Sequence, residues 1–316
     1  MATFAHIINP VRAPAGSELD IVQPATFATV KRALGEAEGK VQVDFLSAQF
    51  PEDHPVIPSW VKKTPDLERS LADLGSFAKP RRLPVLRDIL DRAMQASDAD
   101  YIIFSNADIC LMPSFYLVLN EYAEKGYDAF AINRRRIPAR FAGETRMELL
   151  YAEAGEKHPG YDTLVFRRSL YEKFVLGNVC TGIPRFDTIL IHNFYAFAEN
   201  FRLFTGKHLT FHIGMTLCKR WGDNDQYAFN EKEYAMVRRK LYPHFRIENF
   251  PGANLPFLRR HFKWFLNPTF SYPMMFRLDL SQLSRPRRKR EKKEICGLQN
   301  RWCEFGSRFI NFDDEY

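Results

Sequence analysis

One short run of residues, YIIF at positions 101–104, limits the folds open to this chain more than any other feature. All four residues are large and apolar, as is typical of a strand that is buried on both faces. Such strands lie inside open sheets whose two faces are covered by helices. The surrounding sequence should therefore supply further strands and the helices that cover them.

Segments of both kinds alternate through the first two-thirds of the chain. Residues 26–38 are predicted to form a helix, and a second helix opens at Leu83-Pro84, with apolar residues recurring on one face. Four further segments are rich in β-branched and aromatic residues and are predicted as strands: 4–9, 41–46, 128–133 and 162–168. This rhythm predicts an α/β fold with an open, mixed and mostly parallel Rossmann-like sheet flanked by helices.

The composition is that of a folded chain with a sizeable core. Of the 316 residues, 46% are hydrophobic and 26% are charged, which excludes intrinsic disorder of the whole chain. Beyond residue 250 the regular alternation gives way to aromatic segments that contain Pro. We therefore expect an α/β domain over residues 1–250 and a C-terminal extension over 251–316, with a basic segment at 285–293.

Charge and cysteine content limit the partners and the compartment. The net charge of +7 favours anionic partners such as nucleotides, phospholipid surfaces or nucleic acid, without choosing among them. The first residues lack the regions of a signal peptide, and no run of about 18 apolar residues occurs. The five Cys residues form no CxxC pair, and their odd number argues against a closed disulfide framework. These features predict reduced thiols in a soluble, cytoplasmic protein.

Two oxygen-bearing side chains, Asn106 and Asp108, directly follow the central strand. Ligands of open α/β sheets bind beyond the carboxyl ends of the strands. At i and i+2 on a tight turn, the two side chains can face one hard cation, which would bridge the diphosphate of a nucleotide. The alternative is an Asp that only caps the next turn.

The segment IIFSNADICLMPSFY at 102–116 resembles the strand and DxD motif of GT-A-fold glycosyltransferases, a group that includes the family 2 enzymes. Asn106 stands where that motif has its first Asp, so Asp108 would carry the coordination. Bacterial proteins with an NxD turn, an INRR strand and an HPGYD segment look more similar still, over residues 4–230. The resemblance implies a GT-A-like catalytic domain, a nucleotide-sugar donor, a glycan or lipid-linked acceptor, and Mn²⁺ or Mg²⁺.

The HPGYD segment supplies candidate substrate residues. In the resembling enzymes, a Gly-containing loop before a strand shapes the acceptor side of the cleft. Gly160 would permit close approach of a ligand to the backbone. Asp162 could then hydrogen-bond a sugar hydroxyl, with Tyr161 between them. The alternative is a turn that merely starts the strand.

Asp187 is the candidate catalytic residue. It falls close to the start of a helix predicted over residues 185–193, after the Gly-containing loop. In the resembling inverting enzymes, a carboxylate in a comparable place deprotonates the acceptor hydroxyl as a general base. The resemblance therefore implies an inverting reaction. Favourable placement against the helix dipole is the alternative explanation for this Asp.

The run KHLTFHIGM contains two histidines, His208 and His212, which would share one face of a strand. GT-A enzymes often take a further metal ligand from a C-terminal His, and imidazole suits Mn²⁺. His212 is the preferred ligand and His208 the second choice. The alternative is a hydrogen-bonded histidine in the core.

Several basic residues could bind the donor phosphates, because a guanidinium donates two parallel hydrogen bonds. Each of them could equally belong to a solvated face. Asn9 ends the first strand and is a candidate for contact with the base or ribose. The phosphate candidates are Arg81, Arg82, Arg87 and Arg134.

The sequence contains no P-loop, no GxGxxG and no GxSxG motif, which removes the simplest ATPases, nicotinamide enzymes and serine hydrolases. A metal-dependent glycosyltransferase is the preferred prediction. A non-catalytic binding module for anionic glycans or nucleic acid is the alternative, and a nucleotidyltransferase is a weaker third. The basic segment is typical of a solvated or membrane-attracted run, so peripheral contact with an anionic membrane on its inner face is one prediction. Nonspecific binding of nucleic acid, or no binding role at all, is the alternative. Specific nucleic-acid binding is not expected.

Overall fold

A computed structural model describes residues 1–214, 225–266 and 272–283 of the chain. The chain divides into two compact units, Met1–Asn249 and Phe250–Tyr316. The predicted basic segment at 285–293 lies outside the described residues, as do three of the five Cys. The two described cysteines, Cys110 and Cys180, are buried free thiols.

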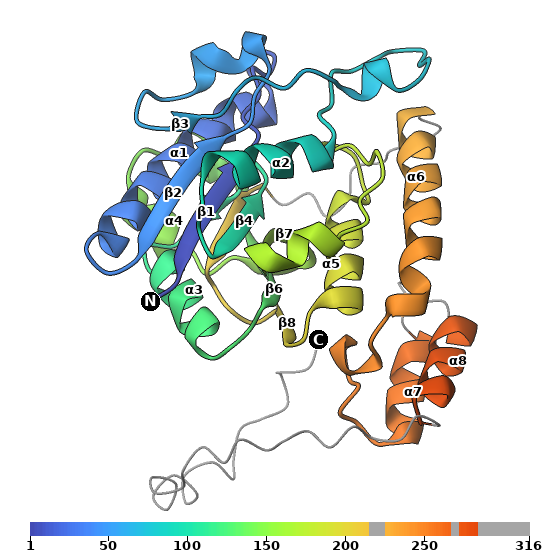
Figure 1. The fold of residues 1–316 in the computed structure, drawn as a ribbon. Coiled ribbons are helices and arrows are strands. Elements are labelled where there is room, and N and C mark those ends of the chain that lie inside the picture. Colours follow the sequence, from blue (N-terminus) through green and yellow to red (C-terminus); the bar gives the residue numbers. More distant parts are fainter. Residues whose placement is uncertain (215–224, 267–271, 284–316) are drawn as a thin grey trace, which may run out of the picture. The chain divides into compact units, whose positions relative to one another are not determined.

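The first unit is built on one mixed sheet with the strand order β3-β2-β1-β4-β7-β6-β9-β5, while β8 also pairs with β6 (Figure 1). The strands β1 to β4 are parallel to one another, and β7 runs antiparallel to both of its neighbours, β4 and β6. In chain order the strands are Thr3–Ile8 (β1), Gln42–Ser47 (β2), Lys62–Lys63 (β3), Tyr101–Ser105 (β4), Cys110–Leu111 (β5), Ala129–Ile137 (β6), Glu156–Arg167 (β7), Phe201–Phe204 (β8) and Thr210–Ile213 (β9).

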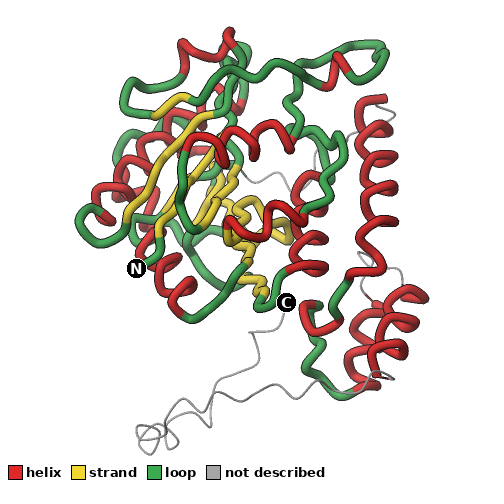
Figure 2. The backbone as a smooth tube through the Cα atoms, viewed as in Figure 1, coloured by secondary structure: helices red, strands yellow, loops and turns green. Residues whose placement is uncertain are grey.

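Helices cover both faces of this sheet (Figure 2). On one face, Phe4, Ile103 and Val165 belong to a core cluster with α1 and α3. On the other face, Phe104 and Phe166 contact the rings of Phe186 and Phe194 from α5. The helices are Glu18–Ala37 (α1), Leu86–Ala96 (α2), Phe115–Glu124 (α3), Met147–Ala152 (α4), Phe186–Phe197 (α5), Asp225–Leu241 (α6), Phe257–Leu266 (α7) and Tyr272–Leu283 (α8).

These observations confirm the predicted fold class, an open mixed α/β sheet flanked by helices. All five residues of β4 are buried, as expected of a central strand. Its neighbour β1 brings His6 into the core, where the imidazole bonds to the hydroxyls of Tyr116 and Ser105 at 2.8 Å each. None of the described helices is both long and apolar enough to cross a membrane.

Two predicted helices begin elsewhere than expected. The first was predicted from residue 26, but α1 begins at Glu18, where the side chain of Ser17 accepts a bond from the Asp20 amide. Pro24 lies inside that helix. The second begins two residues after Pro84, because the backbone of Val85 pairs with that of Cys180 and the Leu86 amide bonds to Val179. Long-range backbone pairing, invisible to local pattern, decides this boundary.

The HPGYD segment is not a loop before a strand, so that part of the prediction was wrong. It lies within β7, which extends from Glu156 to Arg167. Its pairing with β6 shifts register on both sides of Asn133. The irregular steps leave Asp162 and Arg134 out of the regular register between the two strands. Such bulges commonly re-aim side chains beside functional sites.

The buried His192 of α5 should make the stability of the protein sensitive to acid. It is 3% exposed among the rings of Tyr195, Tyr234 and Phe245, and burial, helped by the charge of Arg238, lowers its pKa to about 3. Since an unfolded His titrates near pH 6.5, stability should be lost as the pH falls from 6.5 towards 3.

We expect His192→Phe to remove this loss. Between pH 8 and pH 5, the free energy of unfolding should fall by about 2 kcal/mol more in the wild type than in the variant. Urea denaturation at the two pH values measures the difference. Equal losses in both proteins would show that His192 is not kept neutral by the fold.

Candidate active site

The sheet topology brings distant segments to one edge. The strands β4 and β6 run in the same direction, because each is antiparallel to β7, and β9 is parallel to β6. The end of β4, the second half of β6, the first half of β7 and the end of β9 therefore meet at the carboxyl edge. This is the edge at which open α/β sheets bind ligands.

Asp108 and His212 meet at this edge. A turn closed by the bond from the Ile109 amide to the Asn106 carbonyl carries Asp108. The following strand β5 pairs with β9 and holds the turn beside His212. The His212 Nε2 lies 3.3 Å from Asp108 Oδ2 and 3.6 Å from Glu18 Oε1, at the start of α1.

A second carboxylate, Asp162, is held by Arg134. The Arg134 Nη1 lies 2.6 Å from Asp162 Oδ1, and both side chains are largely buried. The amide of Asn106 donates to the same oxygen at 3.4 Å. Arg134 also lies 3.4 Å from the ring of His158, whose Nδ1 accepts the Gly160 amide. The predicted residues Asn106, Arg134 and Asp162 are thus in direct contact.

Both carboxylates are buried, but the pKa of Asp108 is lowered and that of Asp162 is raised. Burial opposes ionisation of Asp108, but the bond to His212 and the charge of Arg134 outweigh it, so its pKa is below the usual value. For Asp162 burial wins over Arg134, and the charges of Asp108 and Asp187 add to it, which raises the pKa to about 6. The site therefore contains a carboxylate that the fold itself does not fully stabilise.

Asp187 belongs to the same group of charges, since it raises the pKa of Asp162. It lies in the first turn of α5, as predicted, and its Oδ1 accepts the amide of Thr188 at 2.7 Å. Burial raises its own pKa. The helix begins after Arg185, the one non-glycine residue in the described chain with a positive φ, 96°. Backbone strain of this kind is typical of functional positions.

Arg185 is held in that conformation by α6. Its guanidinium bonds to Glu231 and lies 5.0 Å from the ring centre of Tyr234. Asn230 of the same helix donates to the carbonyls of Cys180 and Pro184 in the preceding loop. Contacts with α6 therefore fix the start of α5, and with it the position of Asp187.

Buried polar atoms without a hydrogen-bond partner among the described residues gather at this edge. Each such atom costs about 1–3 kcal/mol, so a cluster points to a ligand, an ion or water. The carboxylates contribute one oxygen each, Asp108 Oδ1 and Asp162 Oδ2. The others here are Asn133 Oδ1, Arg134 Nε, Thr163 Oγ1 and His212 Nδ1.

The donor atoms fit a hard divalent cation. No group of three His, Cys, Asp or Glu side chains stands ready to bind one among the described residues. Magnesium sites, however, commonly use one or two carboxylates and complete the shell with substrate phosphates and water. The unpartnered Asp108 Oδ1 supplies such a ligand, and the neighbouring imidazole of His212 suits Mn²⁺.

Two predicted features of the site differ from the structure. His208 precedes the strand β9, which begins at Thr210, so it does not share a strand face with His212 as predicted. The close approach to Gly160 comes from this chain, because a Cβ there would lie 2.9 Å from the ring of His158. Tyr161 pairs with Asn133 in β6, and burial raises its pKa to about 12.

Two of the four remaining donor candidates, Asn9 and Arg82, use their side chains in contacts within the chain. The Asn9 amide donates to the Ala48 carbonyl at 2.8 Å and ties the ends of β1 and β2 together. Arg82 pairs with Glu52 at 2.8 Å and covers the ring of Phe50. Arg81 is exposed. The Arg87 carbonyl accepts a bond from the Tyr171 hydroxyl. Their contact with a donor remains a prediction.

Sequence reasoning missed three residues of the site: Glu18, Asn133 and His158. Glu18 follows the helix cap Ser17, and a Ser followed by acidic residues is a usual helix-start signal. That signal could have placed Glu18 at a helix start. Nothing in the sequence could have placed it next to His212, because 194 positions separate them.

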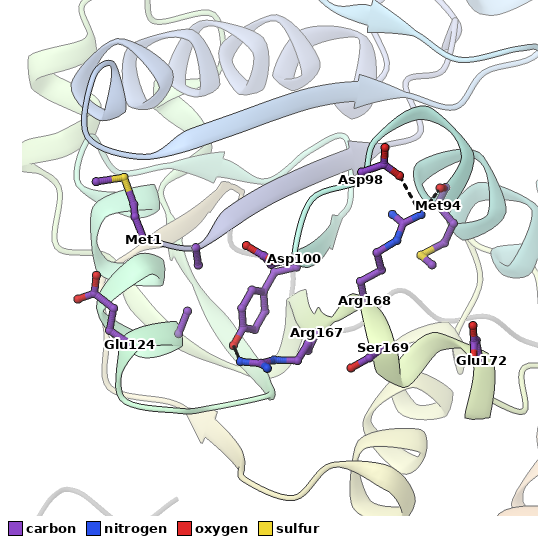
Figure 3. A pocket seen from close by; sticks show the side chains of 12 residues that line it. Met1, Met94, Asp98, Asp100, Glu124, Arg167, Arg168, Ser169 and Glu172 are labelled. Carbon is purple, nitrogen blue, oxygen red and sulfur yellow. Dashed lines mark hydrogen bonds and ion pairs between the residues drawn. The ribbon is translucent and has the colours of Figure 1, made fainter.

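A hollow of about 730 Å³ lies at the opposite, amino edge of the sheet, lined by residues such as Tyr101, Arg167 and Arg168 (Figure 3). Its arginines are already paired. Arg168 bonds to the carbonyls of Met94 and Ser97, and Arg167 donates to the Tyr101 hydroxyl at 3.3 Å. These groups do not require a ligand, in contrast to those at the carboxyl edge.

We expect Asp162→Asn to change the pH dependence of stability. An unfolded Asp titrates near 3.8 and the folded Asp162 near 6, so the wild type should lose stability as the pH rises through this window. The amide does not ionise. Relative to the wild type, the variant should therefore gain about 2–3 kcal/mol between pH 4 and pH 7.5, measured by urea denaturation without divalent cations.

Asp73→Asn is the matched control. The amide and hydroxyl of Ser70 lower the pKa of Asp73, so its ionisation affects stability only as the pH falls below about 3.8, and this variant should respond to the rise from pH 4 to pH 7.5 as the wild type does. If Asp162→Asn and the wild type respond alike to pH, the pKa of Asp162 is not raised in the folded protein.

Comparisons with known proteins give fold likeness only. No protein-family model and no curated protein matches the sequence. S. aureus TarS 1-349 in complex with UDP-GlcNAc is 11% identical with a TM-score of 0.46, over 82% of this chain and 69% of that one. M. tuberculosis glucosyl-3-phosphoglycerate synthase with phosphoglyceric acid is 12% identical with a TM-score of 0.42, over 76% and 80%. Such low values carry no argument about activity.

Proposed function

We propose that this chain is a metal-dependent glycosyltransferase that moves a sugar from a nucleotide-diphosphate donor to an acceptor hydroxyl. One observation carries the proposal: unpartnered buried polar atoms, two of them carboxylate oxygens, gather at the carboxyl edge of the sheet. Nucleotides bind at this edge of open α/β sheets. The resemblance of residues 102–116 to the GT-A strand and DxD motif names the reaction class.

In this proposal, Asp108 and His212 hold Mn²⁺ or Mg²⁺, with Asn106 as a weaker neutral ligand. The bound cation would neutralise the negative charge of the diphosphate leaving group. Arg134, 2.6 Å from Asp162, can turn part of its guanidinium to the donor phosphates. Asn9 and the arginines 81, 82 and 87 are the remaining donor candidates.

Asp187 is the proposed general base. Its raised pKa makes the carboxylate a better proton acceptor near neutral pH than an exposed Asp. The acceptor hydroxyl gives its proton to Asp187, its oxygen bonds to the anomeric carbon, and the bond from that carbon to the diphosphate oxygen breaks. A single displacement of this kind inverts the anomeric configuration. Gly160, Tyr161 and Asp162 line the proposed acceptor side, for a glycan or lipid-linked acceptor.

One observation favours the alternative function, a non-catalytic binding module for anionic glycans or nucleic acid. No three-residue metal cluster stands ready among the described side chains. Arg134 and the neighbouring arginines would then serve as the anion-binding groups. The two functions differ in their need for a cation, so a metal-dependent ligand separates them.

We expect one of UDP, GDP, CDP or dTDP to raise the melting temperature of the protein only when Mn²⁺ is present. A ligand at about 100 times its Kd adds about 2.7 kcal/mol of stability, a shift of several degrees. The shift should disappear in Asp108→Ala and in His212→Ala. Differential scanning fluorimetry with the four nucleotides measures it.

Two matched variants serve as controls for this measurement. His208→Ala removes the other histidine of the same segment, which precedes β9, and Asp98→Ala removes an exposed carboxylate at the opposite edge; both should keep the shift. A shift that needs no Mn²⁺ would exclude the metal assignment. Absence of any shift would favour the binding module.

We expect Asp187→Asn to abolish transfer while the Mn²⁺-dependent thermal shift remains. Loss of a general base lowers the rate by about 10²–10⁴-fold. Release of nucleoside diphosphate from the sugar nucleotide, with water as acceptor, can be followed before the natural acceptor is identified. Turnover at the wild-type rate would remove Asp187 from the role of base.

A further inference from the structure

The second unit exposes large apolar side chains on one face of α7. The exposed fractions are 80% for Leu258, 66% for Phe262, 65% for Phe265 and 62% for Leu266. These four positions follow the i, i+4, i+7, i+8 spacing of a single helix face. An apolar stripe this exposed is unusual for a helix of a soluble protein and marks a docking surface.

The opposite face of α7 already has its partner, the helix α8. Trp264 is buried and donates to the Pro251 carbonyl at 2.8 Å. The His261 Nε2 lies 2.8 Å from the Asp279 carboxylate of α8. The Arg260 guanidinium donates two hydrogen bonds to the same carboxylate, of 2.8 and 2.9 Å. The packing of α7 on α8 therefore leaves the stripe of Leu258, Phe262, Phe265 and Leu266 outward.

Positive charge accompanies this stripe. Arg259 and Lys263 lie next to it on the helix, and Arg277 is exposed on α8. Asp279 is the only acidic residue of positions 250–283, and it is buried against Arg260. Over residues 250–316 the sequence has 13 Lys or Arg against 7 Asp or Glu, so this unit holds six of the chain's seven net positive charges.

We propose that the stripe of Leu258, Phe262, Phe265 and Leu266 docks on an anionic phospholipid surface. Aromatic and Leu side chains beside Arg and Lys are the features by which an amphipathic helix lies in the interface of a bilayer. The apolar side chains enter the boundary between headgroups and acyl chains, while Arg259 and Lys263 reach the headgroup phosphates. A second copy of this basic unit would be repelled by its like charge.

The test is co-sedimentation of the full chain with vesicles of phosphatidylcholine alone or with phosphatidylglycerol added. We expect binding only to the anionic vesicles. The double variant Phe262→Ser, Phe265→Ser should weaken partition by about tenfold or more, since it removes two inserted aromatic rings. Both side chains are largely exposed. The ring of Phe265 lies 5.4 Å from that of Tyr272 in α8, but the bonds from Arg260 and His261 to Asp279, which join the two helices, remain in the variant. Met236→Ser, an exposed apolar residue of α6, is the matched control and should bind as the wild type does.

Three outcomes would overturn the proposal. The wild type could fail to bind anionic vesicles. The double variant could bind as tightly as the wild type, with binding lost in high salt, which would assign it to basic residues alone. Finally, the wild type could self-associate in sedimentation velocity without lipid while the double variant stays monomeric, which would assign the stripe to a second copy. None of these measurements depends on nucleotide binding, so they are independent of the proposed activity.

Discussion

The ion pair between Arg134 and Asp162 links the parts of the site. Its 2.6 Å contact crosses from β6 to β7, where the register between the two strands is irregular. Without the bulge both side chains would follow the regular alternation of the sheet. The pair lowers the cost of burying Asp162 but does not remove it, because the pKa of that carboxyl is still raised to about 6. The fold thus holds Asp162 where burial disfavours its ionised form.

The two edges of the sheet also differ in how well their buried polar groups are hydrogen-bonded. At the amino edge, the arginines of the hollow are paired with backbone carbonyls or with a phenol hydroxyl. At the carboxyl edge, oxygens of Asp108 and Asp162 lack partners among the described residues. Since unsatisfied buried groups cost stability, the group of them at the carboxyl edge is the feature on which the proposed cation and anionic ligand rest, although such atoms also occur elsewhere in the described chain.

Much of the fold could be predicted because its signals are local. The apolar run at 101–104 predicted the buried central strand, and the alternation around it predicted an α/β sheet. Helix starts were less accurate: Ser17 caps α1 well before the predicted start, and pairing of Val85 with Cys180 delays α2. The HPGYD segment was assigned to a loop because the resembling enzymes have a Gly-containing loop before a strand at this point. Its place inside β7 depends on pairing with β6, which no local pattern reveals.

By itself, the sequence determined the residue types of the site and their positions at strand and helix ends: Asn106 and Asp108 after β4, and Asp187 in the first turn of α5. Only the tertiary structure decided which of them meet. His212 rather than His208 faces Asp108, because β5 pairs with β9 and brings that residue to the turn. Glu18 joins them from the start of α1. Periodicity and capping act within a few residues of chain, whereas contact between positions 18, 108 and 212 depends on strand order, which is set by burial of the whole sheet.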